Sequence, residues 1–199
     1  SEIDQALVAC REAQVILLCL GETAEMSGEA ASRADIGLPG AQRALAESIF
    51  ALGKPVVVLL TSGRPLAAPW LFERADAVLA TWQLGSEAGH ALADIIFGAI
   101  NPTGRLPISW PRAVGQAPIF YNQRATGRPT EIGVHYSSCY IDTLSSPQFP
   151  FGHGLSYSVF SLLEFSCLTP LVTRGERVEL SVRLRNEDHA LAKPRYFSS

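Results

Sequence analysis

Helical and strand-like hydrophobic patterns alternate along the first half of the chain. Apolar residues at helical spacing over residues 4–13 lead into an unbroken apolar run over residues 15–20, which is typical of a strand covered on both faces. A second helix is predicted over 41–52, followed by a second buried strand, rich in β-branched residues, over 54–60. Because a helix separates these two strands, we expect them to be parallel, with a right-handed crossover.

The alternation occurs once more before it is lost. A short helix is predicted over 67–74, a short buried strand over 77–80 and an amphipathic helix over 85–97. Three successive units of this kind predict an α/β fold, specifically a three-layer α/β/α sandwich with a mostly parallel sheet.

After the third unit, prolines interrupt a long stretch that has no clear periodicity. Two further strands are predicted over 160–168 and 177–185, and the second alternates apolar with polar residues, as a half-buried antiparallel strand does. A β-sandwich needs about seven strands, so we expect an incomplete β segment. The predicted parts are an α/β sandwich domain over 1–112, a loop-rich connector packed on it over 113–158, and the start of a β domain over 159–199.

Composition narrows the possible classes of protein. With 47% hydrophobic and 18% charged residues, the 199-residue chain can bury a sizeable core. Its net charge of -3 comes from interspersed acidic and basic residues, so a nucleic-acid partner is not expected. The apolar runs are far shorter than the roughly 20 residues of a membrane span. The four cysteines and four histidines lack metal-ligand spacing, so neither a metal nor another cofactor is predicted.

Three stretches of sequence resemble a known family. The first is GETAEMSGEAASRADI at 21–36, the second runs from Thr81-Trp82 to Trp110-Pro111, and the third is FPFGHGLSY at 149–157. In this order and spacing they resemble glycoside hydrolase family 3, of the bacterial periplasmic β-glucosidase type. They are similar to its acid/base loop, to the later part of its α/β sandwich and to the junction before its fibronectin-like domain.

The resemblance implies a division of labour between domains. In this family a (β/α)8-type barrel supplies an aspartate nucleophile, the sandwich domain supplies the acid/base, and a fibronectin type III-like domain often follows. The implied activity is that of a retaining, exo-acting β-glucosidase that removes terminal non-reducing β-D-glucosyl residues from an oligosaccharide or glycoside. The implied partner is the N-terminal barrel domain of the same enzyme, without which we expect the 199 residues to be inactive. The implied location is periplasmic or secreted, although the N-terminus lacks a signal pattern.

Retaining glycosidases need two carboxyl groups roughly 5 to 5.5 Å apart. By resemblance the general acid/base is Glu29, with Glu22, at the end of the predicted strand, as second choice and Glu25 as third. A loop glutamate is otherwise most often a solvated surface residue. Arg33 is a candidate substrate-site residue, because its guanidinium suits bidentate pairing with carboxylates; a surface salt bridge is equally expected. Trp82 could stack on a sugar, although its large apolar area favours a core position.

Two other classes of function are compatible with the sequence. The chain could be a non-catalytic carbohydrate-binding or interaction module. It could also be a nucleotide-binding α/β domain, but no glycine-rich phosphate loop follows either buried strand. Serine catalysis is not expected, because Thr61-Ser62-Gly63-Arg64 lacks the Gly-x-Ser-x-Gly elbow of hydrolases.

Overall fold

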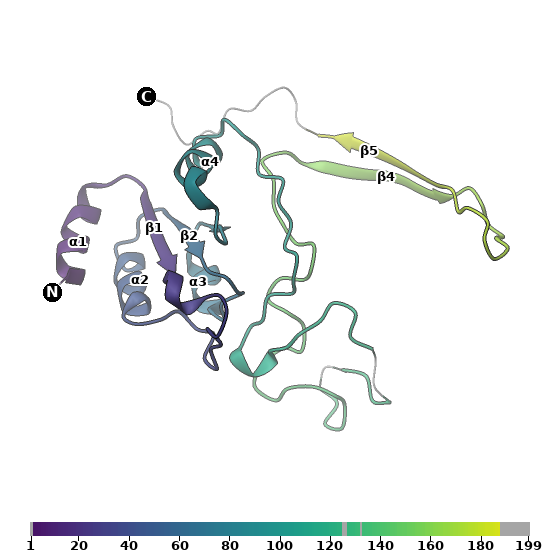
Figure 1. The fold of residues 1–199 in the computed structure, drawn as a ribbon, viewed down its shortest axis with the longest axis horizontal. Helices are drawn as coiled ribbons and strands as arrows, with labels where there is room; N and C mark the ends of the chain where they lie inside the picture. The colour runs from purple at the N-terminus through teal and green to yellow at the C-terminus, as the bar shows by residue number, and fades with distance from the viewer. Residues whose placement is uncertain (1, 125–126, 132, 188–199) are drawn as a thin grey trace. The chain divides into compact units, whose positions relative to one another are not determined.

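The computed structural model describes residues 2–124, 127–131 and 133–187 (Figure 1). The chain forms two compact units, each made of two segments that are distant in sequence. The first unit comprises Ser1–Gly85 and Arg105–His153, and the second comprises Ser86–Gly104 and Gly154–Ser199.

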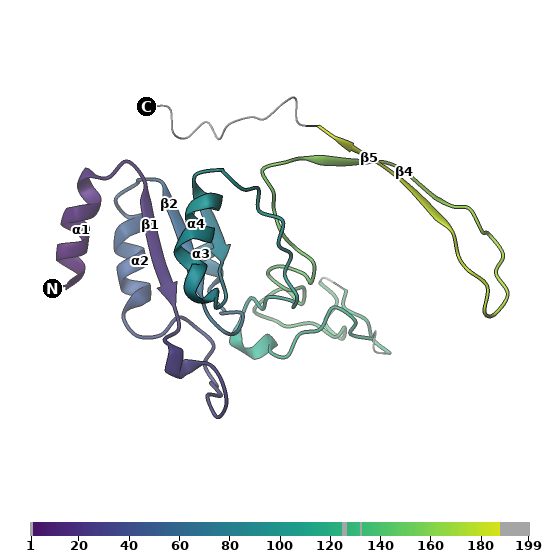
Figure 2. The ribbon, with the colours of Figure 1, turned by 45° about the horizontal axis from the view of Figure 1, so that its top comes forward.

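A parallel sheet forms the centre of the first unit. Its strands lie in the order β1 (Ile16–Gly21), β2 (Val56–Thr61) and β3 (Ala77–Ala80), with Ile16 paired to Val56 and Val57 paired to Ala77. Three helices accompany it, α1 (Glu2–Glu12), α2 (Gln42–Phe50) and α3 (Pro69–Arg74), and α1 lies beside α2 in Figures 1 and 2. The predicted α/β fold with a parallel sheet is confirmed.

One face of β1 supplies much of the core. Alternate residues Ile16, Leu18 and Leu20 are buried, and they join Ala46 and Ile49 of α2 in one hydrophobic cluster. On the opposite face of β1, Leu17 and Cys19 are exposed. In β2, by contrast, three consecutive residues, Val58 to Leu60, are all buried, as expected for a strand covered on both faces.

Gly21 lets the ends of β1 and β2 approach closely. Its φ is +142°, and a Cβ at this position would lie 1.7 Å from the carbonyl oxygen of Thr61. The next backbone N–H, that of Glu22, donates to the same oxygen at 2.9 Å. The amide side chain of Gln42, the first residue of α2, bonds both the N–H and the C=O of Gly21, at 2.8 and 2.7 Å. The chain therefore leaves β1 along a fixed path.

The segment after residue 104 returns to the sheet and its helices. Trp110 is 2% exposed, and its indole N–H donates to the carbonyl oxygen of Leu66 at 2.8 Å. It forms an isolated antiparallel bridge with Phe149, and Phe72 of α3 meets both rings edge-on. Two stretches of the segment that are distant in sequence are thereby fixed to the core. A short 3-10 helix, η3 (Val114–Gln116), lies between them.

The second unit contains a helix and a two-stranded ribbon. Helix α4 (Ala88–Ile96) follows the 3-10 turn η2 (Gly85–Glu87), as the predicted helix over 85–97 anticipated. Tyr157 donates its hydroxyl to the carbonyl oxygen of Ile95 at 2.7 Å, and Asn101 accepts from the backbone N–H of Tyr157 at 2.9 Å. Parts of the second and third sequence motifs therefore meet within this unit.

The ribbon consists of β4 (Phe160–Cys167) and β5 (Leu180–Asn186), which pair antiparallel with each other. The sequence predicted both strands and an antiparallel pattern for the second. The predicted half-burial is wrong, because every residue of β5 is exposed, including Leu180, Val182 and Leu184. Alternation shows which side chains share a face, but burial needs a second layer over that face.

Among the residues that the structure describes, none of the helices has the length and apolar character that a membrane-spanning helix requires.

Candidate functional site

A loop of residues 22–37 leaves the carboxyl end of β1, the edge at which parallel α/β sheets present functional groups. It begins with Glu22 and contains one short 3-10 helix, η1 (Ala24–Met26). Ser62, the first residue after β2, starts a second, shorter turn at the same edge of the sheet. The polar contacts between these two segments define the candidate site.

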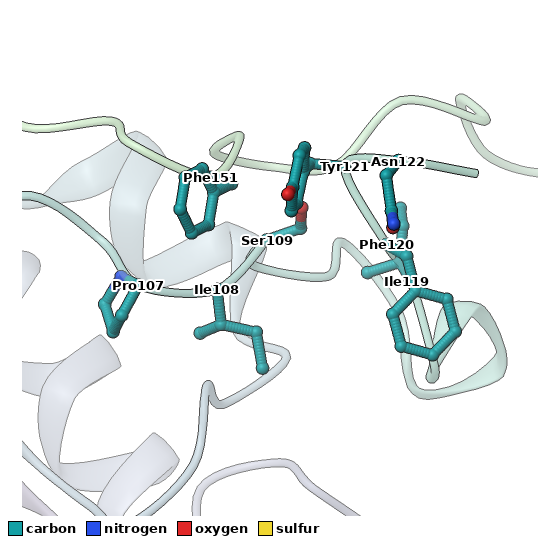
Figure 3. A pocket seen from close by; sticks show the side chains of 8 residues that line it. All are labelled: Pro107, Ile108, Ser109, Ile119, Phe120, Tyr121, Asn122 and Phe151. Atoms are coloured by element: carbon teal, nitrogen blue, oxygen red, sulfur yellow. The ribbon is translucent and has the colours of Figure 1, made fainter. Parts of the chain in front are cut away.

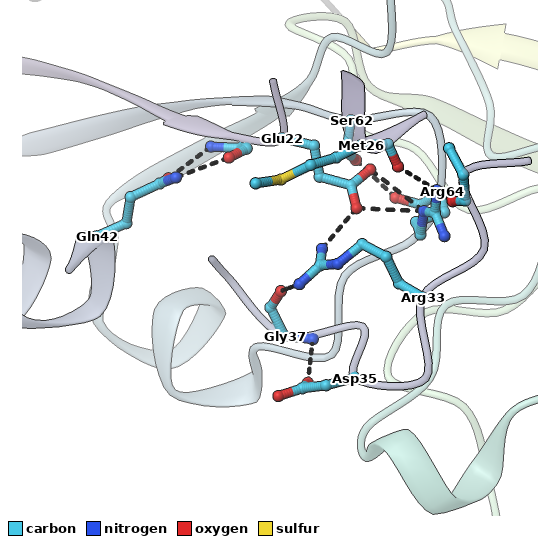
Figure 4. Close-up of polar contacts among 10 residues, drawn as sticks. Glu22, Met26, Arg33, Asp35, Gly37, Gln42, Ser62 and Arg64 are labelled. Atoms are coloured by element: carbon cyan, nitrogen blue, oxygen red, sulfur yellow. Dashed lines mark hydrogen bonds and ion pairs between the residues drawn. The ribbon is translucent and has the colours of Figure 1, made fainter. Parts of the chain in front are cut away.

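Glu22 is the most enclosed carboxylate of the loop, with a side chain only 1% exposed. It accepts a hydrogen bond from Nη1 of Arg33 at 2.5 Å and from Nε of Arg64 at 3.2 Å (Figure 4). The arginine side chains are 20% and 22% exposed. We call this arrangement of Glu22, Arg33 and Arg64 the carboxylate clip.

The two arginines of the carboxylate clip also bind the loop backbone. Arg64 donates through Nη2 to the carbonyl oxygen of Met26 at 2.5 Å and to that of Ala31 at 2.8 Å. Arg33 donates through Nη2 to the carbonyl oxygen of Gly37 at 3.1 Å (Figure 4). The carboxylate clip therefore connects the start, the middle and the end of the loop.

The turn after β2 also supports the loop through close packing. A Cβ on Gly63 would lie 1.7 Å from Oγ of Ser27, so a larger residue at this position would require Ser27 to shift. Ser62 donates its hydroxyl to the carbonyl oxygen of Arg64 at 2.6 Å, which fixes the turn that delivers the guanidinium.

Glu29, the predicted acid/base, lies in the middle of the loop and is exposed. It occupies a turn between Gly28, whose φ is +123°, and Ala30, whose φ is +60°. The backbone N–H of Ala31 donates to the carbonyl oxygen of Gly28 at 3.3 Å across this turn. The turn therefore leaves Glu29 open to solvent.

Glu25, the third candidate, is also exposed. A hydrogen bond from the side chain of Thr23 holds the pKa of its carboxyl below the usual value, and the backbone N–H of Glu25 itself contributes in the same direction. The three glutamates of one loop thus occupy different surroundings, and only Glu22 is enclosed.

Arg33 does form the carboxylate pairing that its guanidinium suggested, but its partner is Glu22 within the same loop. Trp82 is half-buried and packs against the core cluster, with its ring 5.9 Å from that of Trp110. Its backbone φ of +49° is uncommon for a bulky residue and fixes the direction in which the indole leaves β3. A sugar-stacking role for Trp82 stays a prediction.

Two small hollows lie beside the site, with volumes of about 170 and 220 Å³. They share Ile108, Ser109, Ile119 and Phe120, and the larger also touches Ile36 of the loop and Arg64. Ligand sites usually enclose about 300 to 1,000 Å³, so neither hollow alone has the size of such a site. Figure 3 shows the smaller one, where Tyr121 and Phe151 stack with centroids 4.6 Å apart.

Sequence reasoning missed Arg64 and the aromatic residues around the hollows. A usable signal for Arg64 was available, since Thr61-Ser62-Gly63-Arg64 follows a strand predicted to be parallel to β1, and adjacent parallel strands end at the same edge. Phe120 and Tyr121 lie in the stretch without periodicity, where no such argument applies, whereas Phe151 belongs to the motif FPFGHGLSY, which gave no role for its ring. Among the described residues, no group of three or more His, Cys, Asp or Glu side chains could hold a metal ion.

A comparison with protein-family models matches residues 1–157 to the glycosyl hydrolase family 3 C-terminal domain. The chain belongs to glycosyl hydrolase family 3. This confirms the resemblance carried by the three motifs. The match includes the whole of the loop over 22–37 and both strands that deliver the carboxylate clip.

Curated relatives within the family include the periplasmic beta-glucosidase of Salmonella typhimurium, which is 44% identical over 92% of this chain and 24% of its own length. A beta-xylosidase of Formosa agariphila is 41% identical over 78% of this chain and 21% of its own length. The crystal structure of a beta-glucosidase from Listeria innocua superposes with a TM-score of 0.88 and 43% identity, over 94% of this chain and 26% of that one. The chain therefore spans about a quarter of the length of these relatives.

Proposed function

We propose that this chain is the acid/base-bearing segment of a retaining, exo-acting β-glucosidase, with Glu29 as its general acid/base. The observation that carries the proposal is the exposed carboxylate of Glu29 on the loop that leaves β1, within a family 3 C-terminal domain. The substrate would carry a terminal non-reducing β-D-glucosyl residue. The beta-xylosidase relatives favour a terminal β-xylosyl residue as the second candidate.

The proposed chemistry has two steps. In the first, a carboxylate nucleophile attacks the anomeric carbon, while Glu29 gives its proton to the departing glycosidic oxygen. In the second, Glu29 takes a proton from a water molecule. The water oxygen then attacks the anomeric carbon and displaces the enzyme carboxylate, which releases the sugar. The nucleophile would come from a barrel domain of the same enzyme, the partner that the family resemblance implies.

Glu22 is less suited to this chemistry than Glu29. Its side chain is 1% exposed and its carboxylate accepts hydrogen bonds from two arginines, so no part of it is open to a sugar. A general acid has to come within hydrogen-bond reach of the oxygen that it protonates. The contrast in exposure between the two side chains supports Glu29, rather than Glu22, as the general acid/base.

The remaining assignments are part of the same proposal. The α/β sandwich domain would cover 1–112, the connector 113–158 and the start of a fibronectin-like domain 159–199. The antiparallel ribbon of β4 and β5 supports a β domain in the last of these, of which residues 188–199 lie outside the described structure. A periplasmic or secreted location is supported by the name of the Salmonella relative.

The test uses the Salmonella periplasmic beta-glucosidase with its matching segment replaced by this chain, here called the chimera. We expect the chimera to hydrolyse an aryl β-glucoside, Glu29→Gln to abolish most of that activity, and the isolated chain to have none. Robust turnover by the isolated chain, or a chimera whose activity is indifferent to Glu29→Gln, would contradict the proposal. Parallel assays with an aryl β-xyloside decide between the two sugars.

Calorimetry of the isolated chain tests the non-catalytic alternatives. If the isolated chain binds glucose and the chimera is inactive, the two results would favour a carbohydrate-binding module. Binding of a nucleotide would favour a nucleotide-binding α/β domain.

A further inference from the structure

We propose that the carboxylate clip is a positioning device for Glu29, and that Glu22, Arg33 and Arg64 act on catalysis through the geometry of the loop. This inference rests on the proposed function, because it assumes that Glu29 is the acid/base. It assigns a role to three side chains that would not themselves touch the substrate.

The loop has little else to hold its shape. None of residues 23–35 is buried, so the hydrophobic packing that fixes the strands contributes little here. The residues around Glu29 are small, namely Ser27, Gly28, Ala30, Ala31 and Ser32, and they offer little apolar surface. The conformation of such a segment has to be set by polar contacts.

Arg64 makes the contacts that matter most for Glu29. Its Nη2 donates to the carbonyl oxygens of Met26 and Ala31, which bracket Glu29 in the sequence. Its Nε donates to Glu22, which is 1% exposed and held at the exit of β1. A rigid guanidinium therefore links the backbone on both sides of Glu29 to the end of the sheet.

Glu22 in turn holds both arginines in place. One carboxylate faces two guanidinium groups, and the buried pairing fixes the direction of each. Replacing Glu22 with a neutral residue would leave two cations close together with no anion between them. We expect them to separate and to release the backbone carbonyls that they hold.

Small displacements of an acid/base have large kinetic effects. A general acid acts only within hydrogen-bond reach of the departing oxygen, and a misplacement of about 1 Å can cost about 100-fold in rate. The loss should be concentrated in substrates whose leaving group needs a proton. A dinitrophenolate leaving group departs without being protonated, whereas a methoxy group has to receive a proton to depart.

The test compares kcat/KM for dinitrophenyl β-glucoside and methyl β-glucoside in the chimera, since this constant reports cleavage of the glycosidic bond. We expect Glu22→Gln and Arg64→Lys each to lower kcat/KM for the methyl glucoside by about 10- to 100-fold more than for the dinitrophenyl glucoside. Glu47→Gln, which makes the same chemical change in an exposed pair with Arg43, should leave the ratio unchanged. Both substrates are measured on one sample, so a variant that folds poorly lowers both rates and leaves their ratio intact.

The outcomes separate this inference from the proposed function. If Glu29→Gln changes the ratio strongly but the carboxylate clip variants do not, the positioning role is wrong and Glu29 stands. If Glu29→Gln itself leaves the ratio unchanged, the proposed function fails first.

Hydrogen exchange in the 199-residue chain gives a second measurement that needs no activity. In Arg64→Lys, amides of residues 22–37 should exchange at least about tenfold faster, while those of β2 keep their protection. Lysine keeps the charge but cannot donate to Glu22, Met26 and Ala31 in the fixed geometry of a guanidinium. Unchanged exchange in the loop would overturn the inference, as would a uniform change over loop and strand.

Discussion

The sheet and the loop that leaves it are stabilised by different physical means, although Gly21 and Glu22 join them directly. The sheet is held by apolar burial, with Ile16, Leu18 and Leu20 of β1 inside one cluster. The loop over 22–37 is held by the carboxylate clip and has no buried residue between 23 and 35. Sheet substitutions should therefore act on folding, whereas substitutions in the carboxylate clip should act on the geometry of Glu29 as well as on stability.

The strongest test of this contrast is a pair of glycine substitutions, one in each region. Gly21→Ala should destabilise the chain by about 4 kcal/mol, because its Cβ would lie 1.7 Å from the carbonyl oxygen of Thr61. Gly28 also has a positive φ, but nothing lies within 4 Å of its Cβ position. Gly28→Ala should therefore cost only the backbone strain, about 1 kcal/mol. Urea denaturation of both variants measures the difference, and equal losses would contradict it.

The two faces of β1 give the next largest effect. Leu18 is 5% exposed in the core, so Leu18→Ala should lower the free energy of unfolding by about 3 kcal/mol. Leu17, its neighbour on the opposite face, is 47% exposed, and Leu17→Ala should cost less than about 1 kcal/mol. Denaturation of the two variants checks the ranking. A larger loss for Leu17→Ala would mean that the exposed face of β1 is covered.

Within the loop, the carboxylate clip should be the main source of stability. Glu22→Ala removes the carboxylate that pairs with two part-buried arginines, and we expect a loss of about 3 kcal/mol. Glu47→Ala breaks the exposed pair with Arg43 and should cost at most about 0.5 kcal/mol. Thermal denaturation of both variants gives the comparison. Similar small losses would show that the loop keeps its conformation without the carboxylate clip.

The same division explains what the sequence could predict. Apolar periodicity predicted all three strands of the sheet, and β3 has the predicted bounds of residues 77–80. The predicted second strand began at Lys54, but β2 begins at Val56, since Pro55 has no N–H to donate and contributes only its carbonyl oxygen, which accepts from Ile16 at 2.9 Å. Local patterns are informative where burial sets the structure.

The candidate site depended on information that local patterns lack. The family resemblance gave Glu29 and ranked it above Glu22, but the physical difference between them depends on Arg64, which is 42 residues from Glu22 in the sequence. A pairing over that distance follows from the parallel arrangement of β1 and β2. For β4 and β5 the sequence pattern predicted the two strands and the antiparallel type of the second but not the burial, because the covering layer is not encoded in the strands themselves.

The smallest expected effect concerns Glu25, which is exposed in the same loop as Glu22. The hydroxyl of Thr23 donates to its carboxylate and lowers its pKa, so this contact stabilises the fold at a pH above the ordinary glutamate value and is lost as the pH falls through the lowered pKa. Thr23→Val should raise the pKa of Glu25 towards its ordinary value, whereas Thr23→Ser, which keeps the hydroxyl, should leave it low. A titration followed by NMR measures the pKa of Glu25 in the unchanged 199-residue chain and in the two variants. An unchanged pKa in Thr23→Val would contradict the role of the Thr23 hydroxyl and would leave the backbone N–H of Glu25 as the contact that lowers the pKa.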